Sequence, residues 1–448
     1  MENRTIKIIV ASAVLVIVLS VAAAIFLISG FLRPFIDSPR NVDAEIAKLR
    51  ARGKPVAPED LAPAPIPASQ NAAVVYNEIF RLMHTRISEA DQEKIGEFVN
   101  PRSGVRGVKL WEDVRHIVER NRDLVGKVQA AVARPRCYFT LDWSKGADMP
   151  LPCQPEMRRL AQLITAAAIV RAKSGDMGGA VRALVLAFRT SEDISEQPLL
   201  GPQLVGVAIV SMASRASNDV LNHGGLTETE GDELFRALGE IDISSNWKKA
   251  LEGERAMGIS VFEHYRGTHV RNKRNDPNSV YERIDKSEVA DFMEGRDELR
   301  YLVLTDRQIK AFHLPWRDKR TPRSDEHVRC RLPGDPFLTA ILMVPSSRSR
   351  ATRDIAIAQL AGVRTLVALR VYHDRYDRYP QTLTDLRDKL GWKLPQDIFS
   401  GKDLIYKPQG HGFILYSIGP DLTDSGGVPQ KKQGRYDSRG DIVWKLDH

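Results

Sequence analysis

The run ATRDIAIAQLAGVRTLVALRVYHDRYDRYP, residues 351–380, decides how the end of this 448-residue chain folds. Its apolar residues recur at steps of three and four, at Ala356, Leu360, Val363, Val367 and Val371. That spacing predicts an amphipathic helix with one buried face. Proline disfavours helical geometry in the residue before it, so we expect the helix to end near residue 379.

Short β-like runs follow this helix. They are LIY at 404–406 and GFILYS at 412–417, with Pro-Gln-Gly between them. A polar loop, GPDLTDSGG at 419–427, and a final GDIVW at 440–444 complete the region. A helix followed by short strands predicts a small α+β domain over residues 346–448.

This order of parts resembles the globular region of the major pseudopilin of type II secretion systems. In that family a long helix ends before Tyr-Pro, a β-meander follows, and a glycine-rich acidic loop precedes a late Asp-Ile and an aromatic residue. The matching residues are Tyr379, Pro380, Ser417, Gly419, Asp421, Gly426, Gly427, Asp441, Ile442 and Trp444. The sequence departs from the family at Leu422, where the family has glycine, and in a basic insertion at 430–435.

The resemblance implies a calcium site in the polar loop, with Ser417, Asp421, Asp424 and Asp441 as ligands and Asp437 as a further candidate. Calcium takes about six to eight oxygen ligands, which carboxylates, hydroxyls and carbonyls supply. The alternative is that Asp421 and Asp424 cap turns, since Asp readily accepts hydrogen bonds from nearby backbone N–H groups.

The N-terminal run IIVASAVLVIVLSVAAAIFLISGF, residues 8–31, is apolar and uncharged. It is long enough to cross the roughly 30 Å hydrocarbon core, and longer than the apolar part of a signal peptide, about 7–15 residues. We therefore predict a single-pass signal anchor over residues 1–32. Basic residues flank both sides, so an extracytoplasmic body is implied by the resemblance and not by charge. The run lacks the acidic residue of pseudopilins, which argues against assembly into a pilus.

The rest of the chain is predicted to be mainly α-helical. Residues 33–70 are proline-rich and predict a stiff linker with a short helix at 42–52. Residues 71–345 predict a helical domain, with Asn71 as one N-cap and Thr227 and Glu230 as a capping box. Short glycine-containing connections suit a helical bundle or a hairpin repeat. This part resembles helical regions of bacterial membrane-anchored proteins, a resemblance that implies no activity.

Composition and charge narrow the choice of partners. The chain is 43% hydrophobic, which supports folded cores, and its net charge is +8 with a pI near 9.3. With the body outside the cytoplasm, we expect no nucleic-acid partner. Anionic lipid headgroups or cell-envelope polymers fit the charge better, and a solvated basic surface is the simplest explanation.

The cysteines suggest one disulfide. Cys137 and Cys153 enclose a loop and can pair in an oxidising compartment. The spacing along the sequence does not fix the distance between their Cα atoms, so free thiols are the alternative. Cys330 is the third cysteine and remains outside this pair; we expect it to be a small, buried hydrophobic residue.

Glu254 is the most unusual polar residue of the helical region, because it lies on the apolar stripe of a helix predicted at 247–265. Burial would raise its pKa and suit it to catalysis. More often such a carboxylate pairs with an Arg or lies at the edge of the stripe. Glu263, His264 and His269 fit neither HExxH nor another zinc spacing, so they are weak metal candidates.

The chain contains no GxSxG, P-loop, HExxH or dinucleotide-binding motif. We therefore expect a membrane-anchored interaction or structural protein of the cell envelope that binds a protein partner, with a type II secretion accessory as a special case. This hypothesis predicts grooves lined by apolar side chains and no cluster of carboxylates with perturbed pKa values. The alternative is an envelope hydrolase using carboxylates such as Glu254, which predicts two acids facing each other across a pocket.

Overall fold

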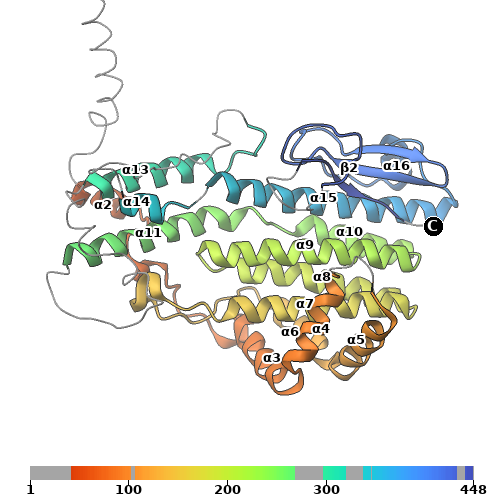
Figure 1. Ribbon diagram of the computed structural model, residues 1–448, viewed down its shortest axis with the longest axis horizontal. Helices are drawn as coiled ribbons and strands as arrows, with labels where there is room; N and C mark the ends of the chain where they lie inside the picture. The colour runs from red at the N-terminus through yellow and green to blue at the C-terminus, as the bar shows by residue number, and fades with distance from the viewer. Residues whose placement is uncertain are drawn as a thin grey trace, which may run out of the picture.

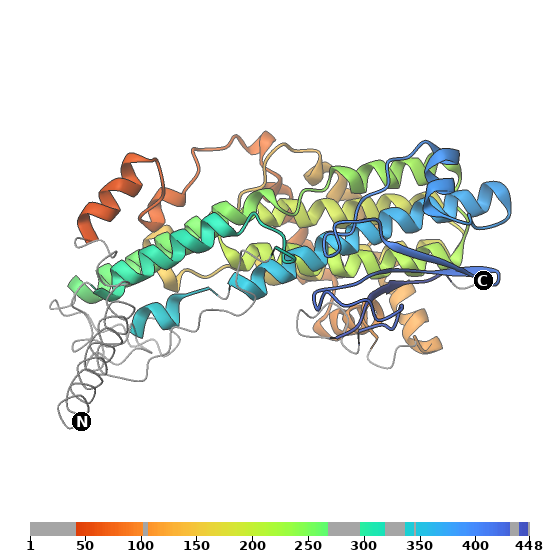
Figure 2. The ribbon, with the colours of Figure 1, turned by 90° about the horizontal axis from the view of Figure 1, so that it is seen from above.

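The computed structural model describes residues 42–101, 106–267, 296–318, 337–344, 346–430 and 439–446. The predicted membrane anchor lies outside these ranges, as do His269, Cys330 and Asp437. The described chain is mainly helical with a small antiparallel sheet near the C-terminus, which confirms the predicted fold class at that level. The body is elongated, and the sheet lies at one end of it (Figures 1 and 2).

Three long antiparallel helices form the centre of the body: α7 (Cys153–Lys173), α8 (Met177–Ser195) and α9 (Leu200–His223). The helices packed around them are α3 (Ala72–Arg86), α4 (Glu89–Val99), α5 (Val108–Arg120), α6 (Arg122–Val132) and α10 (Glu228–Glu240). The predicted caps are confirmed. Asn71 accepts a hydrogen bond from the Ala73 N–H at 3.1 Å, and Thr227 and Glu230 form the capping box of α10.

A second layer of helices extends past the centre at the end opposite the sheet (Figure 1). It contains α11 (Ser245–Gly267), α13 (Arg296–Ala311), α14 (Phe337–Leu342) and α2 (Val42–Ala51). Ile46 of α2 packs in one apolar cluster with residues of all three other helices, among them Phe262, Leu302 and Leu338. The α2 helix confirms the short helix expected at 42–52.

The described part of the proline-rich segment lies against the body and is not extended throughout. Three 3-10 turns lie in or beside it: η1 (Pro58–Leu61), η2 (Ala68–Gln70) and, farther along the chain, η3 (Trp143–Asp148). Asp60 accepts hydrogen bonds from the backbone N–H groups of Val56 and Ala57, which closes the η1 turn. Val56 and Leu61 are then buried, so burial of apolar side chains overrides the stiffness of the prolines.

The C-terminal region contains α15 (Ser346–Tyr376), α16 (Leu383–Leu390), β1 (Ile405–Gln409), β2 (Gly412–Ser417) and β3 (Ile442–Trp444). The helix predicted from residue 351 begins five residues earlier, at Ser346. The strands pair antiparallel in the order β1-β2-β3, with Leu415 opposite Trp444. Trp444 lies directly on α15 at Gly362, where a Cβ atom would be only 2.1 Å from the indole ring.

One hydrophobic core joins the helical centre to the C-terminal region. It runs from Ala72 of α3 to Leu446 after β3, and α15 packs on both α9 and α10. The core therefore crosses the boundary predicted at residue 346. Within the part of the chain that the structure describes, two stretches, Leu200–His223 and Leu338–Tyr376, are long and apolar enough to cross a membrane, and both are mostly buried inside the body. Burial accounts for their apolar composition.

Candidate functional site

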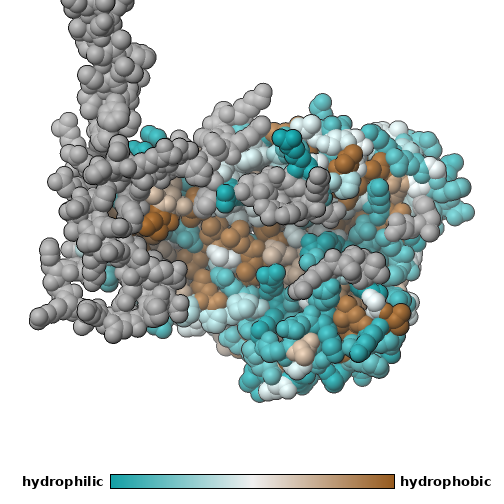
Figure 3. Space-filling view, viewed as in Figure 1, coloured by the Kyte–Doolittle hydropathy of each residue, from teal (hydrophilic) through white to brown (hydrophobic). Residues whose placement is uncertain are grey.

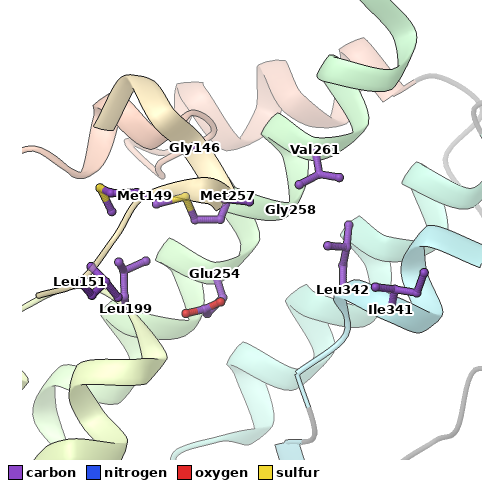
Figure 4. A pocket seen from close by; sticks show the side chains of 11 residues that line it. Gly146, Met149, Leu151, Leu199, Glu254, Met257, Gly258, Val261, Ile341 and Leu342 are labelled. Carbon is purple, nitrogen blue, oxygen red and sulfur yellow. The ribbon is translucent and has the colours of Figure 1, made fainter. Parts of the chain in front are cut away.

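A pocket of about 500 Å³ opens between α11, α14 and the segment around η3 (Figure 4). We call it the Glu254 pocket. It is lined by Gly146, Ala147, Met149, Leu151, Leu199, Glu254, Met257, Gly258, Val261, Ile341 and Leu342. On the face drawn in Figure 3, hydrophobic residues gather in the region where α11 and α14 lie in Figure 1. The lining is apolar apart from one carboxylate.

Glycines allow the walls of this pocket to come together. A Cβ on Gly258 would lie 2.0 Å from the Tyr301 Oη, so α13 can approach α11 only because this residue has no side chain. The Tyr301 hydroxyl donates to the carbonyl oxygen of Glu254 at 3.0 Å. On the opposite wall, Gly146 has φ of 52°, a conformation that residues with a Cβ rarely adopt.

Glu254 is held at the start of α9. Its Oε1 accepts the backbone N–H of Leu200 at 2.8 Å, and the residue before α9, Leu199, provides no side-chain cap of its own. A carboxylate at a helix N-terminus is favoured by the helix dipole. Burial nevertheless raises the pKa of Glu254, while the hydrogen bond from Leu200 lowers it. Within the described ranges, Oε2 has no hydrogen-bond or ion-pair partner.

The expected pairing of Glu254 with an arginine is not found in the described part of the chain. The next residue, Arg255, is buried and lies near Glu252 and Asp306. Glu254 is half-buried and faces the pocket, which agrees with the other alternative, a position at the edge of the apolar stripe. Of the described residues that line the pocket, Glu254 alone is ionisable. One carboxylate suits binding, whereas acid–base hydrolysis needs two.

The carboxylates predicted to bind calcium lie in and beside the C-terminal loop, where each accepts hydrogen bonds. Asp421 accepts the N–H groups of Thr423 and Gly440, both at 3.1 Å. Asp424 accepts from Gly426 N–H at 2.8 Å and from the Tyr416 hydroxyl at 3.1 Å. These bonds agree with the turn-capping alternative.

Asp441 and Ser417 complete the predicted ligand set. Asp441 is fully buried, and its two oxygens accept the N–H groups of Ser425 at 3.2 Å and Gly427 at 2.7 Å. Burial raises the pKa of Asp441, and nearby Asp424 and Asp421 raise it further. Ser417 instead donates to Asp397 at 2.7 Å. No group of three His, Cys, Asp or Glu side chains in the described ranges is arranged to hold a metal ion, so calcium stays a prediction.

Leu422, at which the sequence departs from the pseudopilin pattern, has a backbone conformation that glycine adopts more readily than leucine. Leu422 has φ of 59°, which costs a residue with a Cβ roughly 1 kcal/mol. The loop backbone therefore adopts the left-handed geometry even without the residue that favours it.

The other sites predicted from the sequence are the cysteine pair and the weak metal candidates on α11. Cys137 and Cys153 are both buried and are free thiols in this structure, so the disulfide stays a prediction. Glu263 and His264 are exposed on α11.

One buried polar pair was not predicted from the sequence. Tyr76 donates a hydrogen bond to Asp193 at 2.5 Å, and burial raises the pKa of Asp193 to about 7. Asp193 lies in the acidic run SEDISE, which resembles a solvated surface in the sequence.

No protein-family model, curated protein or solved structure matches this chain, so its function has to be argued from the site alone.

Proposed function

We propose that this chain is a membrane-anchored protein of the cell envelope that docks a partner protein, and that apolar side chains of the partner enter the Glu254 pocket. The observation that carries the proposal is the pocket lining. Among its described residues, one carboxylate lies between aliphatic and methionine side chains, and one of its oxygens has no partner in the described chain. Methionine-rich apolar surfaces adapt to the shape of a bound segment.

The position of the pocket supports a role close to the membrane. It shares α11 and α14 with the apolar cluster that holds α2. Ten residues, 32–41, separate α2 from the apolar N-terminal run. A chain of that length spans at most about 35 Å, so an anchor over residues 8–31 keeps α2 and the neighbouring pocket close to the lipid surface.

The carboxylate suggests the chemistry of the partner. An unpaired buried carboxylate is costly, and a bound Lys or Arg would relieve that cost by a charge-assisted hydrogen bond. We therefore expect a partner segment with aliphatic residues next to one basic residue. Among the described residues, no second acid faces Glu254 across the pocket, as the envelope-hydrolase alternative would require. The link to type II secretion is supported only by the resemblance of residues 346–448.

Photo-crosslinking in intact envelopes tests this docking proposal. A photoreactive residue at Ile341, which is 51% exposed and lines the pocket, is expected to give one adduct of defined mass. The same residue at Val74, 47% exposed on α3, is the matched control and is expected to give none. Glu254→Gln should reduce the Ile341 adduct while leaving the fold intact. Equal labelling at the two positions would contradict a docking role.

We also propose that the C-terminal loop binds calcium through Asp421, Asp424 and Asp441. Burial is the main reason that the pKa of Asp441 is raised, and the charges of Asp424 and Asp421 raise it further, a repulsion that a cation would relieve. Melting the full-length chain with calcium, with magnesium and with chelator tests this. At a tenfold excess over Kd, calcium should stabilise the fold by about 1.4 kcal/mol. Identical melts would leave turn capping as the role of these residues.

A further inference from the structure

A second cavity, of about 850 Å³, lies between α4, α7 and α9 and shares no lining residue with the Glu254 pocket. We call it the α4–α9 cavity. Its apolar surface comes from Val99, Leu110, Ala208 and Met212. Unlike the Glu254 pocket, it is also lined by two arginines, Arg158 of α7 and Arg215 of α9, and by the amide of Gln162.

Arg215 carries a buried donor without an acceptor. Its Nε is enclosed and has no hydrogen-bond partner among the residues that the structure describes, and burial lowers the pKa of the guanidinium. The negative charge of Asp219, one turn along α9, raises this pKa and so opposes the effect of burial. Asp219 is already bonded to Arg106, whose Nη2 lies 2.6 Å from its Oδ2. An enclosed guanidinium donor without an acceptor is costly, and a small shift of this side chain toward a ligand oxygen in the cavity would satisfy it.

Arg158 is exposed and, in the ranges that the structure describes, has no carboxylate within 4.0 Å. The acids around it are taken by its neighbour, because Arg159 lies 3.3 Å from Glu89 and 3.5 Å from Glu156. The third cation of the lining, Lys94, is paired with Asp113 at 3.1 Å. Arg158 and Arg215 are therefore the two cations that the cavity can offer to a ligand.

The amide of Gln162 adds a neutral donor. Its Oε1 accepts from the Gln92 side chain at 2.9 Å, which assigns the Nε2 group to the other side. No acceptor for Nε2 is found among the described residues. Gly96 of α4 leaves room beside it, since a Cβ there would be 3.5 Å from Nε2.

Acidic residues also line the cavity and limit what it can bind. Glu93 and Glu97 lie one turn apart on α4, across from the helices that carry the arginines. They would repel a polyanion such as nucleic acid. A single oxyanion group held on the arginine side avoids that repulsion, and two guanidinium groups match the charge of a phosphate dianion.

We propose that the α4–α9 cavity binds an organic phosphate monoester, with Arg158 and Arg215 on the phosphate, Gln162 as a further donor, and Leu110 and Met212 against the apolar body of the ligand. Arginine is suited to this task because its planar fork donates two parallel hydrogen bonds to phosphate. A free metabolite and a lipid headgroup share this chemistry, so the test includes an arm for each.

Isothermal titration calorimetry of the full-length chain in nanodiscs of zwitterionic lipid tests the proposal, with phenyl phosphate as the probe. We expect saturable binding of phenyl phosphate, weaker binding of inorganic phosphate, and none of benzylammonium. Arg158→Gln and Arg215→Gln should each weaken phenyl phosphate binding about tenfold or more. Arg236→Gln, which removes the same charge from an exposed site on α10, should leave it unchanged.

Phosphatidic acid in the nanodiscs distinguishes the two sources. Competition with phenyl phosphate would identify a lipid headgroup as the natural ligand, whereas full retention of binding would identify a soluble phosphate. The proposal is overturned if phenyl phosphate does not bind, or if Arg158→Gln binds it as tightly as the unaltered chain. Arg158 is exposed, so its loss should not disturb folding and that second result would be decisive.

Discussion

At the end of the body formed by α11, α13 and α14, one carboxylate oxygen of Glu254 accepts a hydrogen bond from a backbone N–H, and the side chain faces an apolar pocket. At the opposite end, formed by α15 and the sheet, both carboxylate oxygens of Asp441 accept hydrogen bonds from backbone N–H groups, and the residue is fully buried. We call these the pocket end and the sheet end. Both acids have a raised pKa because of burial.

The difference shows what separates a binding group from a structural one. Burial alone does not decide it, since both carboxylates are desolvated. What decides it is whether the fold supplies enough donors to use every oxygen. The sheet end supplies them from its own turns and can close around Asp441. The pocket end leaves a cavity and an unused acceptor, which is the condition for binding a partner.

The largest expected effect tests how tightly the two ends are packed. Gly362→Ala at the sheet end places a Cβ against Trp444 and should cost about 3 kcal/mol of unfolding free energy. Ile341→Phe enlarges a half-exposed residue at the pocket end and should cost less than about 0.5 kcal/mol. Urea unfolding measures both values.

Gly126→Ala is the control for the glycine substitution. Nothing lies within 4 Å of a Cβ at this α6 position, so the alanine should stabilise the fold by about 0.5–1 kcal/mol. If Ile341→Phe lowered the unfolding free energy as much as Gly362→Ala, the two ends would be equally tightly packed, which would contradict the difference described above.

The next effect concerns a carboxylate in α8 that lies between these two extremes. Burial, helped by the charges of Glu196 and Glu192, raises the pKa of Asp193 to about 7. The hydrogen bond from the Tyr76 hydroxyl and the charge of Arg189 oppose this rise. The folded state therefore holds this proton more tightly than the unfolded state. Stability should be highest below about pH 4 as far as this group is concerned, and should fall as the pH rises through 7, by on the order of 3 kcal/mol.

Asp193→Asn should remove most of that pH dependence, because the amide can still accept from Tyr76 and does not ionise. Denaturant unfolding at a series of pH values measures the slope for both proteins. If the slope persists in Asp193→Asn, other groups are responsible and the burial of Asp193 does not control the response.

Matched amide substitutions then compare the two ends directly. Asp441→Asn sets an NH2 group against a backbone N–H and should cost about 2 kcal/mol. Glu254→Gln keeps the acceptor for Leu200 and turns its NH2 toward the pocket, so it should change stability by less than about 0.5 kcal/mol. Thermal melts of the two variants are sufficient. Equal losses would show that Glu254 is as structural as Asp441.

The smallest expected effect concerns backbone strain at Leu422, in the loop at the sheet end. Leu422 holds a left-handed conformation, so Leu422→Gly relieves strain while Leu422→Ala keeps the strain and loses the packing. We expect the glycine variant to be more stable than the alanine variant by about 1 kcal/mol, the reverse of the usual order. The usual order, with alanine better, would mean that the strain is absorbed elsewhere in the loop.

Much of the fold was predictable because its signals are local. The caps at Asn71 and Thr227, the stripe of α15 and the strand at 412–417 each depend on neighbours along the chain. The packing of the proline-rich segment was not predictable. Val56 and Leu61 are buried by contacts with distant helices, and local composition does not record such contacts.

The candidate site was predictable only in part. Glu254 was identified as a polar residue on an apolar stripe, but its partner, the Leu200 N–H, lies 54 residues away in the sequence. Met149, Leu199 and Ile341 look like ordinary core residues until the fold brings them to one pocket. The unpartnered Nε of Arg215 depends on where Asp219 directs its carboxylate, and only the packed helices determine that.

The seating of Trp444 on Gly362 has a consequence for how the chain matures. Trp444 belongs to the same core as residues near position 72, so segments far apart in the sequence must meet before that core is complete. As long as β3 is not docked, the face of α15 at Gly362 is uncovered. Apolar surface that is exposed in this way during folding is prone to aggregation.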